Sequence, residues 1–416
     1  MLALLRRRDF GLLWFGGLVS IAGDWILQAA LPYFVYARTG STVATAGMVV
    51  ATLAPSVVLG SITGVFVDRW NRKHVLVVGN ALQATAVALL VFVPDGGWLG
   101  FVYIAAAAQS AVAAFTNPAE SALLPTLVGP DALVQANALN ALNNRIGRLA
   151  GLPLGGLLLG YLGLRGVVIA DCATFLAAAA LIAPIAAPRP AVGPADDETA
   201  AEEARSALAL FLHEWLEGLR LVRRERALGV MFVVLGIMTF GGTMLDPPYP
   251  AWARDVLGQG PQVFAWLLTT HAAAGTVGAL LVGRLGTRLS PRVLMGWGSL
   301  IAGLMLIVKF NVPTLPVAFG LTAAGGLTSV ASAVGVETLA QQTIRDEYRG
   351  RVFGALGASG ALLSLCGAAT GGALAELIGI VPALTFASVL TASAGVVVLR
   401  AFAERPPRAA ERLPMP

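Results

Sequence analysis

Long apolar stretches separated by short polar segments run through this chain from end to end. A membrane-spanning helix needs about 20 mostly apolar residues, and that template fits twelve segments. They run approximately over residues 10–36, 42–67, 74–94, 99–124, 137–161, 166–187, 227–248, 261–285, 291–310, 313–339, 351–378 and 380–402. No alternation with a period of two appears, which disfavours a β-barrel. The pattern predicts an all-α membrane protein with twelve transmembrane helices.

One long polar segment, residues 188–226, interrupts this pattern. It begins with prolines and acidic residues and then becomes amphipathic, which is typical of a helix lying at a membrane surface. We therefore expect two six-helix bundles joined by a linker. The predicted parts are an N-terminal bundle over 1–187, a cytoplasmic linker with an amphipathic helix over 188–226, a C-terminal bundle over 227–402 and a cytoplasmic tail over 403–416.

Composition and charge agree with a membrane protein. Hydrophobic residues make up 57% of the 416 residues and charged residues only 12%, whereas soluble domains average about 25% charged residues. With the N-terminus inside, 24 of the 28 Lys and Arg residues fall on the cytoplasmic side of the predicted spans, as the positive-inside rule requires. The four on the outer side are Arg38, Arg165, Arg254 and Lys309. Both termini are therefore predicted to be cytoplasmic, in a plasma membrane, and the net charge of +5 needs no nucleic-acid partner.

A charged loop between the second and third spans recurs about half a chain later. The first copy reads Gly64-x-x-x-Asp68-Arg69-x-x-Arg72-Lys73, and a degraded copy begins at Gly283, with Thr287 in the place of the aspartate. A second pair of similar segments, at Val128–Ala138 and Ile344–Gly354, is separated by nearly the same length of chain. These nearly equal offsets indicate a duplicated protein.

The loop, its echo and the six-plus-six layout resemble the major facilitator superfamily of secondary transporters. This resemblance implies that Asp68 faces the start of span eleven, near Gly350, in the outward-open state, with Arg69, Arg72 and Lys73 beside it. The alternative is a solvated basic loop that only enforces topology. Asn71 stands where the family loop usually has Gly, and Asn also tolerates left-handed backbone conformations.

Further short motifs resemble the macrolide-efflux and enterobactin-exporter branch of that superfamily. They include Gly23-Asp24-Trp25, Asn117-Pro118-Ala119, Leu123-Leu124-Pro125 and Arg349-Gly350-Arg351-Val352-Phe353-Gly354. The branch implies efflux of small organic molecules, multidrug transport included, driven by the proton gradient. Span five resembles the antiporter signature Gly-x-x-x-Gly-Pro-x-x-Gly-Gly, with the proline displaced by one residue. Its members here are Gly147, Gly151, Pro153, Gly155 and Gly156.

Ionisable residues inside the predicted spans are the candidates for proton coupling or substrate contact. A charge at the membrane centre costs roughly 2.5–3.5 kcal/mol on insertion scales, so it usually faces a cavity or a partner. The candidates, with one neighbouring aromatic residue, are Asp24, Trp25, Arg148, Asp171, His271 and Glu337. Asp24 and Glu337 lead as proton acceptors.

Each candidate also has a packing explanation. Asp24 could hydrogen-bond to Gln28 or to a neighbouring span. Asp171, placed near the outer end of span six, and Glu337, near the inner end of span ten, could extend to the membrane surface. His271 could be a packing residue, although neutral His can relay protons. Trp25 could belong to the interfacial aromatic belt, and Arg148 could pair with a carboxylate or contact an anionic substrate.

The sequence contains none of the usual enzymatic constellations. It has no phosphate-binding loop and no paired His-x-x-x-His motif, so ATP hydrolysis and the usual zinc sites are not expected. We expect no metal, no cofactor and no enzymatic activity. The predicted protein is a monomeric secondary transporter in a lipid bilayer that acts on a small molecule and protons. Alternatives on the same fold are a uniporter, an importer or a lipid translocator, and a further alternative is a non-transporting sensor or scaffold.

Overall fold

The computed structural model describes residues 2–60, 63–93, 98–186, 213, 215–223, 226–285, 289–344 and 349–401. Every regular element in these residues is a helix. The N-terminal half contains α1 (Leu2–Leu5), α2 (Arg8–Thr39), α3 (Thr42–Leu59), α4 (Thr63–Arg69), α5 (Arg72–Ala88), η1 (Leu89–Phe92), α6 (Gly100–Val128), η2 (Pro130–Ala132) and α7 (Leu133–Ile182). The C-terminal half contains α9 (Arg226–Met244), α10 (Pro248–Ala251), the π-helix η3 (Trp252–Val256), α11 (Pro261–Leu285), α12 (Pro291–Asn311), α13 (Leu315–Thr343), α14 (Arg349–Ile378) and α15 (Ile380–Ala401).

The predicted all-helical membrane fold is confirmed at a coarse level. In the described residues, nine helices are long and apolar enough to cross a membrane, or ten if a bent pair before and within α9 is one span. One of the nine covers 53 residues, or roughly 80 Å at 1.5 Å per residue, whereas a hydrocarbon core is about 30 Å thick. It turns at Gly163, whose φ of 65° is non-helical, so it is long enough for two crossings. The exact number of twelve spans stays a prediction.

Local sequence signals explain where several helices begin and end. Ser41 and Ser290 accept hydrogen bonds from the backbone N–H groups of Ala44 and Val293, which are otherwise unpaired at the starts of α3 and α12. Gly40 ends α2 with a φ of 65°, a left-handed conformation that glycine adopts without strain. Sequence signals of this kind separate neighbouring helices that composition alone would merge.

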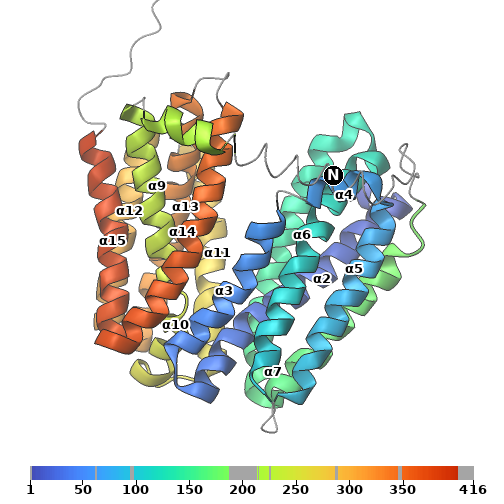
Figure 1. Ribbon diagram of the computed structural model, residues 1–416, viewed down its shortest axis with the longest axis horizontal. Helices are drawn as coiled ribbons and strands as arrows, with labels where there is room; N and C mark the ends of the chain where they lie inside the picture. The colour runs from blue at the N-terminus through green and yellow to red at the C-terminus, as the bar shows by residue number, and fades with distance from the viewer. Residues whose placement is uncertain are drawn as a thin grey trace, which may run out of the picture.

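Two bundles form the molecule (Figure 1). In one bundle α2 packs on α7, α5 packs on α6 and α7, and α3 packs on α6. In the other, α12 packs on α13 and α15, and α9 packs on α14 and α15. The start of α2 and the end of α15 lie at the same end of the molecule (Figure 1). We call this end the terminal end and the opposite one the distal end.

Two helix pairs join the bundles, and they are related as a duplicated fold requires. α3 packs against α14, and α7 packs against α11. Thr42 and Pro261 begin α3 and α11, and they are separated by the same length of chain as the two copies of the charged loop. Leu133 and Arg349 begin α7 and α14, with the separation of the second repeated pair. α3 is therefore equivalent to α11, and α7 to α14, so the two pairs that join the bundles are equivalent to each other.

The seventh predicted span, 227–248, ends earlier than expected. α9 stops at Met244, because Pro247 and Pro248 cannot continue its backbone hydrogen bonds. The chain then forms a turn, the short α10 and the π-helix η3, which together cross the distal end toward α2. Of the predicted linker, residues 215–223 form a helix, and most of the remainder lies outside the described residues.

Candidate functional site

Asp24 lies at the middle of α2, which runs from Arg8 to Thr39. At 1.5 Å per residue the carboxylate is about 23 Å from either end of the helix. The side chain is nonetheless exposed, and its Oδ1 accepts a hydrogen bond from Nε2 of Gln109 in α6 at 3.5 Å. The expected neighbouring-helix partner is therefore present, and it is Gln109 rather than Gln28. A carboxylate at this depth has access to a cavity inside the bundle.

Asp171 lies deeper in the protein than the sequence predicted. It is 0% exposed, and its Oδ2 has no hydrogen-bond partner among the described residues. Its Oδ1 accepts from the hydroxyl of Thr174 at 3.3 Å. A Cβ added to Gly23 would collide with this Asp171 oxygen, so the carboxyl group faces the middle of α2. The packing alternative, a side chain that extends to the membrane surface, does not hold, because Asp171 is fully buried against α2.

A small polar chamber of about 60 Å³ connects Asp24 with a second carboxylate, Glu120 of α6. Its other polar lining residues are Ser20, Asn80, Gln83, Thr116 and Asn117. Asn80 is buried, donates to the carbonyl of Leu76 and leaves its Oδ1 unpaired. The chamber therefore combines two carboxylates with an unpaired amide oxygen, which suits a proton or water between the carboxylates.

Apart from Asp24, and Asn117 as part of a motif, the polar residues of this chamber were not among the predicted site residues. Asn80 and Gln83 are three residues apart on α5, and Asn117 and Glu120 are three apart on α6. In otherwise apolar helices that spacing places each pair on one face. This spacing is the signal that could have identified them.

Arg148 and Trp25, two of the predicted residues, are in direct contact. The guanidinium carbon of Arg148 lies 4.6 Å from the centre of the Trp25 ring. Arg148 is half-buried, and its Nε is buried without a hydrogen-bond partner. Trp25 also packs against the α11 side of the interface, beside Leu268 and Ala272. The pair therefore lies between the two halves rather than in an interfacial aromatic belt.

His271 and Glu337 lie elsewhere. His271 is half-buried in α11, and both Arg148 and Lys309 are within electrostatic range of its ring. Glu337 is exposed on α13, near the end of that helix at Thr343. The described structure thus brings His271 toward the Arg148 region and leaves Glu337 outside the lining of the polar chamber.

The glycine motif of span five is a packing surface. A Cβ at Gly147 would lie 2.6 Å from Cγ2 of Ile21, and one at Gly151 would lie 2.6 Å from Cβ of Trp25. Gly155 faces the backbone of Ile26 in the same helix, α2. Gly156 instead faces α11, where a Cβ would lie 2.7 Å from the Pro261 carbonyl. Three glycines bring α7 against α2, and the fourth brings it against the other half, while Pro153 lies inside the same helix.

The charged loop between α4 and α5 is tied to its own bundle. Arg72 donates to the carbonyl of Ala122 at 3.1 Å, and Lys73 donates to the carbonyl of Ala183 at 3.1 Å. Asn71 has an extended backbone with a φ of −66°, and its side chain accepts from the N–H groups of Lys73 and His74. The left-handed conformation that Asn tolerates is therefore not adopted, because Asn71 serves as the N-cap of α5.

The predicted partner of this loop, the start of α14, has open space beside it. Gly350 is exposed, and a Cβ added there would meet nothing within 4 Å. The side chain of Asp68 lies outside the described residues, as does the environment of Gly64, and Arg69 is half-buried at the end of α4. The contact between Asp68 and the start of α14 stays a prediction.

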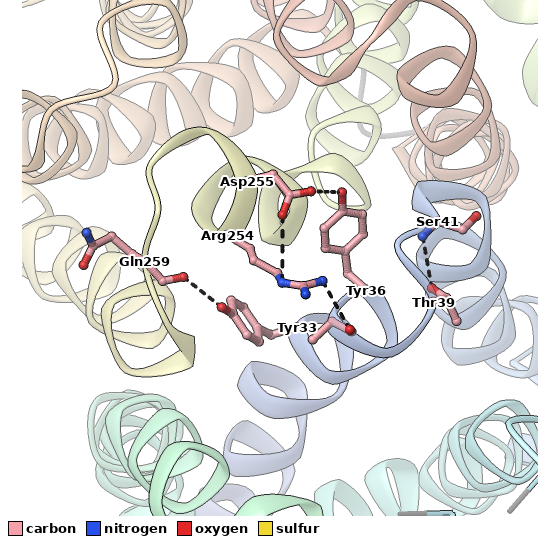
Figure 2. Close-up of polar contacts among 8 residues, drawn as sticks. Tyr33, Tyr36, Thr39, Ser41, Arg254, Asp255 and Gln259 are labelled. Atoms are coloured by element: carbon pink, nitrogen blue, oxygen red, sulfur yellow. Dashed lines mark hydrogen bonds and ion pairs between the residues drawn. The ribbon is translucent and has the colours of Figure 1, made fainter. Parts of the chain in front are cut away.

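Hydrogen bonds join the two halves at the distal end. Figure 2 shows the hydroxyl of Tyr33 donating to the carbonyl of Gln259 at 2.8 Å, and the hydroxyl of Tyr36 donating to the carboxylate of Asp255. Arg254 lies between these contacts, donates to the carbonyl of Ala37 at 3.2 Å and pairs with Asp255 at 3.9 Å. We call the residues of these contacts, in α2 and in the segment 254–259, the distal contacts.

Glu376 of α14 adds a second set of bonds at the same end. Its Oε2 accepts from the hydroxyl of Ser41 at 3.3 Å, from the backbone N–H of Thr42 at 3.2 Å and from the hydroxyl of Thr42 at 3.1 Å. The hydroxyl of Thr42 also lies 2.7 Å from the carbonyl of Gly372. The distal end is therefore held by polar groups at the start of α3 as well as at the end of α2.

Lys309, counted among outer-side basic residues, is almost fully buried. It is 4% exposed, and its Nζ donates to the hydroxyl of Tyr249 at 2.9 Å. The ammonium lies 4.3 Å from the ring centre of Tyr249, 5.0 Å from that of Phe310 and 5.6 Å from that of Trp252. This aromatic cage ties α12 to the segment that carries the distal contacts.

These residues provide what a carrier needs and little that an enzyme would use. Asp24 is an accessible carboxylate at the middle of its helix, Arg148 is a cation between the halves, and the distal contacts close one end. Within the described residues, no three His, Cys, Asp or Glu side chains converge as metal ligands would.

Comparison with known proteins identifies the family. A model of the Major Facilitator Superfamily matches residues 13–245 and 231–416. The chain is 24% identical over 380 residues to macrolide efflux protein A of Streptococcus pyogenes, covering 90% of this chain and 91% of the relative. It is 27% identical over 358 residues to the multidrug efflux pump Tap of Mycobacterium bovis, covering 83% and 82%.

A solved structure has the same fold. A bacterial homologue of the iron transporter ferroportin, in an inward-facing state, superposes with a TM-score of 0.72 at 16% identity, covering 94% of this chain and 98% of the other. At this identity the likeness concerns the fold alone. With the family match across both halves, it leads to one conclusion: this chain belongs to the Major Facilitator Superfamily and is a membrane transporter, not an enzyme.

Proposed function

We propose that this transporter exports small lipophilic or amphiphilic organic molecules in exchange for protons, by alternating access. The observation that carries the proposal is Asp24, an exposed carboxylate at the midpoint of a membrane-spanning helix. Two relatives named for efflux support the direction of transport. The coupling itself is inferred from the chemistry of the site.

A proton on Asp24 changes the free energies of the two conformations by different amounts. A charged carboxylate at the membrane centre is costly unless it reaches water or a partner. In the conformation described here Asp24 reaches the polar chamber, so its charged form is tolerated. In a conformation that closes this access, the neutral acid is favoured. A proton taken up from the other side of the membrane in that conformation is therefore released through the chamber when the carrier returns to the conformation described here, so it moves opposite to the solute.

The charge distribution supports a sidedness. Basic residues gather on the loops at the terminal end, so we assign that end to the cytoplasm and the membrane to the plasma membrane. The distal contacts then close the outer side, and the structure corresponds to a carrier open toward the cytoplasm. Lipophilic solutes would enter from that side.

Flux in everted membrane vesicles tests the proposal. We expect a fluorescent amphiphilic dye to accumulate while a pH gradient exists and to leak when the gradient is collapsed. Asp24→Asn, which keeps the size but not the charge, should lower gradient-driven transport about ten-fold or more and leave exchange of dye down its own gradient intact. Asp131→Asn, in the exposed turn η2, is the matched control.

The outcomes separate the alternatives. Dye transport that ignores the pH gradient would remove proton coupling and favour a uniporter, an importer or a lipid translocator. No transport of any solute, with the protein folded, would favour a sensor or scaffold. Equal loss of activity in Asp24→Asn and Asp131→Asn would remove the special role of Asp24.

A further inference from the structure

Arg148 carries a permanent charge near the middle of its helix. It lies halfway between Leu133, the start of α7, and the kink at Gly163, about 22 Å from each at 1.5 Å per residue. A guanidinium stays protonated in proteins. A charge at that depth is expensive unless water or a partner of opposite sign is available. The side chain therefore needs an explanation beyond packing.

The protein supplies only part of what this guanidinium requires. The Trp25 ring beneath it contributes a cation–π contact of about 0.5–2 kcal/mol. Over the described parts of the chain, the ion pairs found join His213 to Glu217, Arg254 to Asp255 and Arg351 to Glu217, and none includes Arg148. Its Nε is buried and unpaired. The two terminal nitrogens are not among the buried unpaired atoms, and the side chain as a whole is half-buried.

The surroundings of Arg148 are positive on one side and apolar on the other. Arg145 lies within electrostatic range of Arg148, and His271 lies within electrostatic range of both Arg148 and Lys309. Asp24 is adjacent to Trp25 in sequence, but the hydrogen bond seen for its carboxylate comes from Gln109. Trp25, Leu268 and Ala272 provide an apolar surface beside the guanidinium.

We infer that the molecule carried by this transporter is an organic anion, with a carboxylate, sulfonate or phosphate that binds Arg148 and an apolar or aromatic body that packs beside Trp25. This inference rests on the proposed transport function and names its substrate class. A guanidinium binds such a group through two parallel N–H···O bonds. An anion would also satisfy the charge that the protein leaves without a carboxylate. A cationic amphiphile of the same shape would be repelled.

Binding to the purified full-length protein in detergent tests this without a pH gradient. The probes are 2-naphthoate and 2-naphthylmethylammonium, which share a ring system and differ in charge, measured by equilibrium dialysis. We expect wild type to bind naphthoate more tightly than the cation. Arg148→Gln should weaken naphthoate binding by at least about ten-fold, because it removes both charge-assisted hydrogen bonds. Arg148→Lys should retain an intermediate affinity, since it keeps the charge and loses the planar fork.

Arg400→Gln is the control, since it removes one positive charge from the exposed last turn of α15 and should leave both affinities unchanged. Equal or tighter binding of the cation by wild type would overturn the inference. So would no measurable naphthoate binding, or unchanged naphthoate binding by a folded Arg148→Gln protein. If Arg148→Gln and Arg148→Lys weakened the binding of both probes equally, Arg148 would instead stabilise the folded structure.

The same proteins in proteoliposomes separate this inference from the proposed function. Naphthoate binding that depends on Arg148, without proton-driven flux, would sustain the anion site and remove the proton exchange. Proton-driven flux of the cation that is unaffected by Arg148→Gln would sustain the proton exchange and remove the anion site.

Discussion

Three of the enclosed charged side chains are stabilised differently, two near the middle of their helices and one buried at the distal end. Asp24 reaches a polar chamber, Arg148 stacks on Trp25, and Lys309 is enclosed by aromatic rings and one hydroxyl. The first two can change partners as water, protons or ligands enter. Lys309 has its partners within the protein, so we assign it to the architecture of the distal end.

The Lys309 cage gives a prediction about stability. Tyr249→Phe removes the acceptor of the buried ammonium and should cost about 1–3 kcal/mol of the free energy of unfolding. Lys309→Met keeps the apolar stem and removes the charge, so it should be neutral or stabilising. Thermal unfolding in detergent measures both.

The double variant provides the decisive comparison. Because Tyr249→Phe harms the protein through the unpaired ammonium, adding Lys309→Met should restore most of the loss, a coupling that a double-mutant cycle reports. A double variant as unstable as Tyr249→Phe alone would show that the hydroxyl acts through something other than Lys309.

Residue identities could be predicted from the sequence more readily than residue environments. Asp24, Trp25 and Arg148 stand out because charges and their neighbours in apolar spans are unusual, and the structure brings Trp25 and Arg148 together. The depth of Asp171 could not be predicted because it depends on where the chain turns at Gly163. The cage of Lys309 could not be predicted because two of its rings come from a segment far away in the sequence.

At the scale of helices, glycines control how closely α2, α7 and α11 approach. Gly147, Gly151 and Gly155 recur every four residues, which is the spacing of one helix face. The spacing predicts a close contact, but the partner helix cannot be read from it. That partner, α2, carries Asp24 and Trp25, so this packing also fixes the positions of the site residues.

Gly151→Ala tests that packing. The added methyl group would collide with the backbone of Ala22 and lie 2.6 Å from Cβ of Trp25, and overpacking of this kind costs about 1–3 kcal/mol. We expect a lower unfolding temperature and weaker transport.

Gly320→Ala in α13 is the matched control, because a Cβ there meets nothing within 4 Å. Alanine is favoured over glycine in a helix by up to about 1 kcal/mol, so this variant should be unchanged or slightly more stable. Equal effects of the two substitutions would contradict a packing role for Gly151.

For the whole molecule, the distal contacts decide which conformation is populated. Tyr36 and Ala37 of one half bond to Asp255 and Arg254 of the other. Composition and loop charges predicted two bundles, but not the segment that crosses between them. Proline at the end of α9 signals a break, whereas the direction of the following chain depends on contacts with α2 and α12.

Weakening these contacts should shift the conformational balance. Tyr36→Phe with Asp255→Asn removes a hydrogen bond to a charged acceptor, worth about 1.5–3 kcal/mol, so the population open at the distal end should rise about ten-fold or more. Spin labels at the exposed positions Leu162→Cys and Leu377→Cys, in a background without the two native cysteines, would report longer distances by pulsed electron resonance.

Thr39→Val provides the comparison, because the Thr39 hydroxyl bonds to Val35 and Ser41 within its own half. It should leave the distance distribution unchanged. The same distribution in wild type and in the Tyr36/Asp255 variant would mean that the distal contacts do not set the balance.

The polar chemistry of the distal end has an energetic consequence for regulation. Hydroxyls, carbonyls and carboxylates that separate can be rehydrated at once, so each neutral bond contributes only about 0.5–1.5 kcal/mol net. A seal of packed leucines would instead lose about 25 cal/mol for every Å² of apolar surface exposed. A partly polar seal therefore keeps the two states closer in free energy than a fully apolar seal would. A smaller contribution from a proton or a bound solute then suffices to change which state predominates.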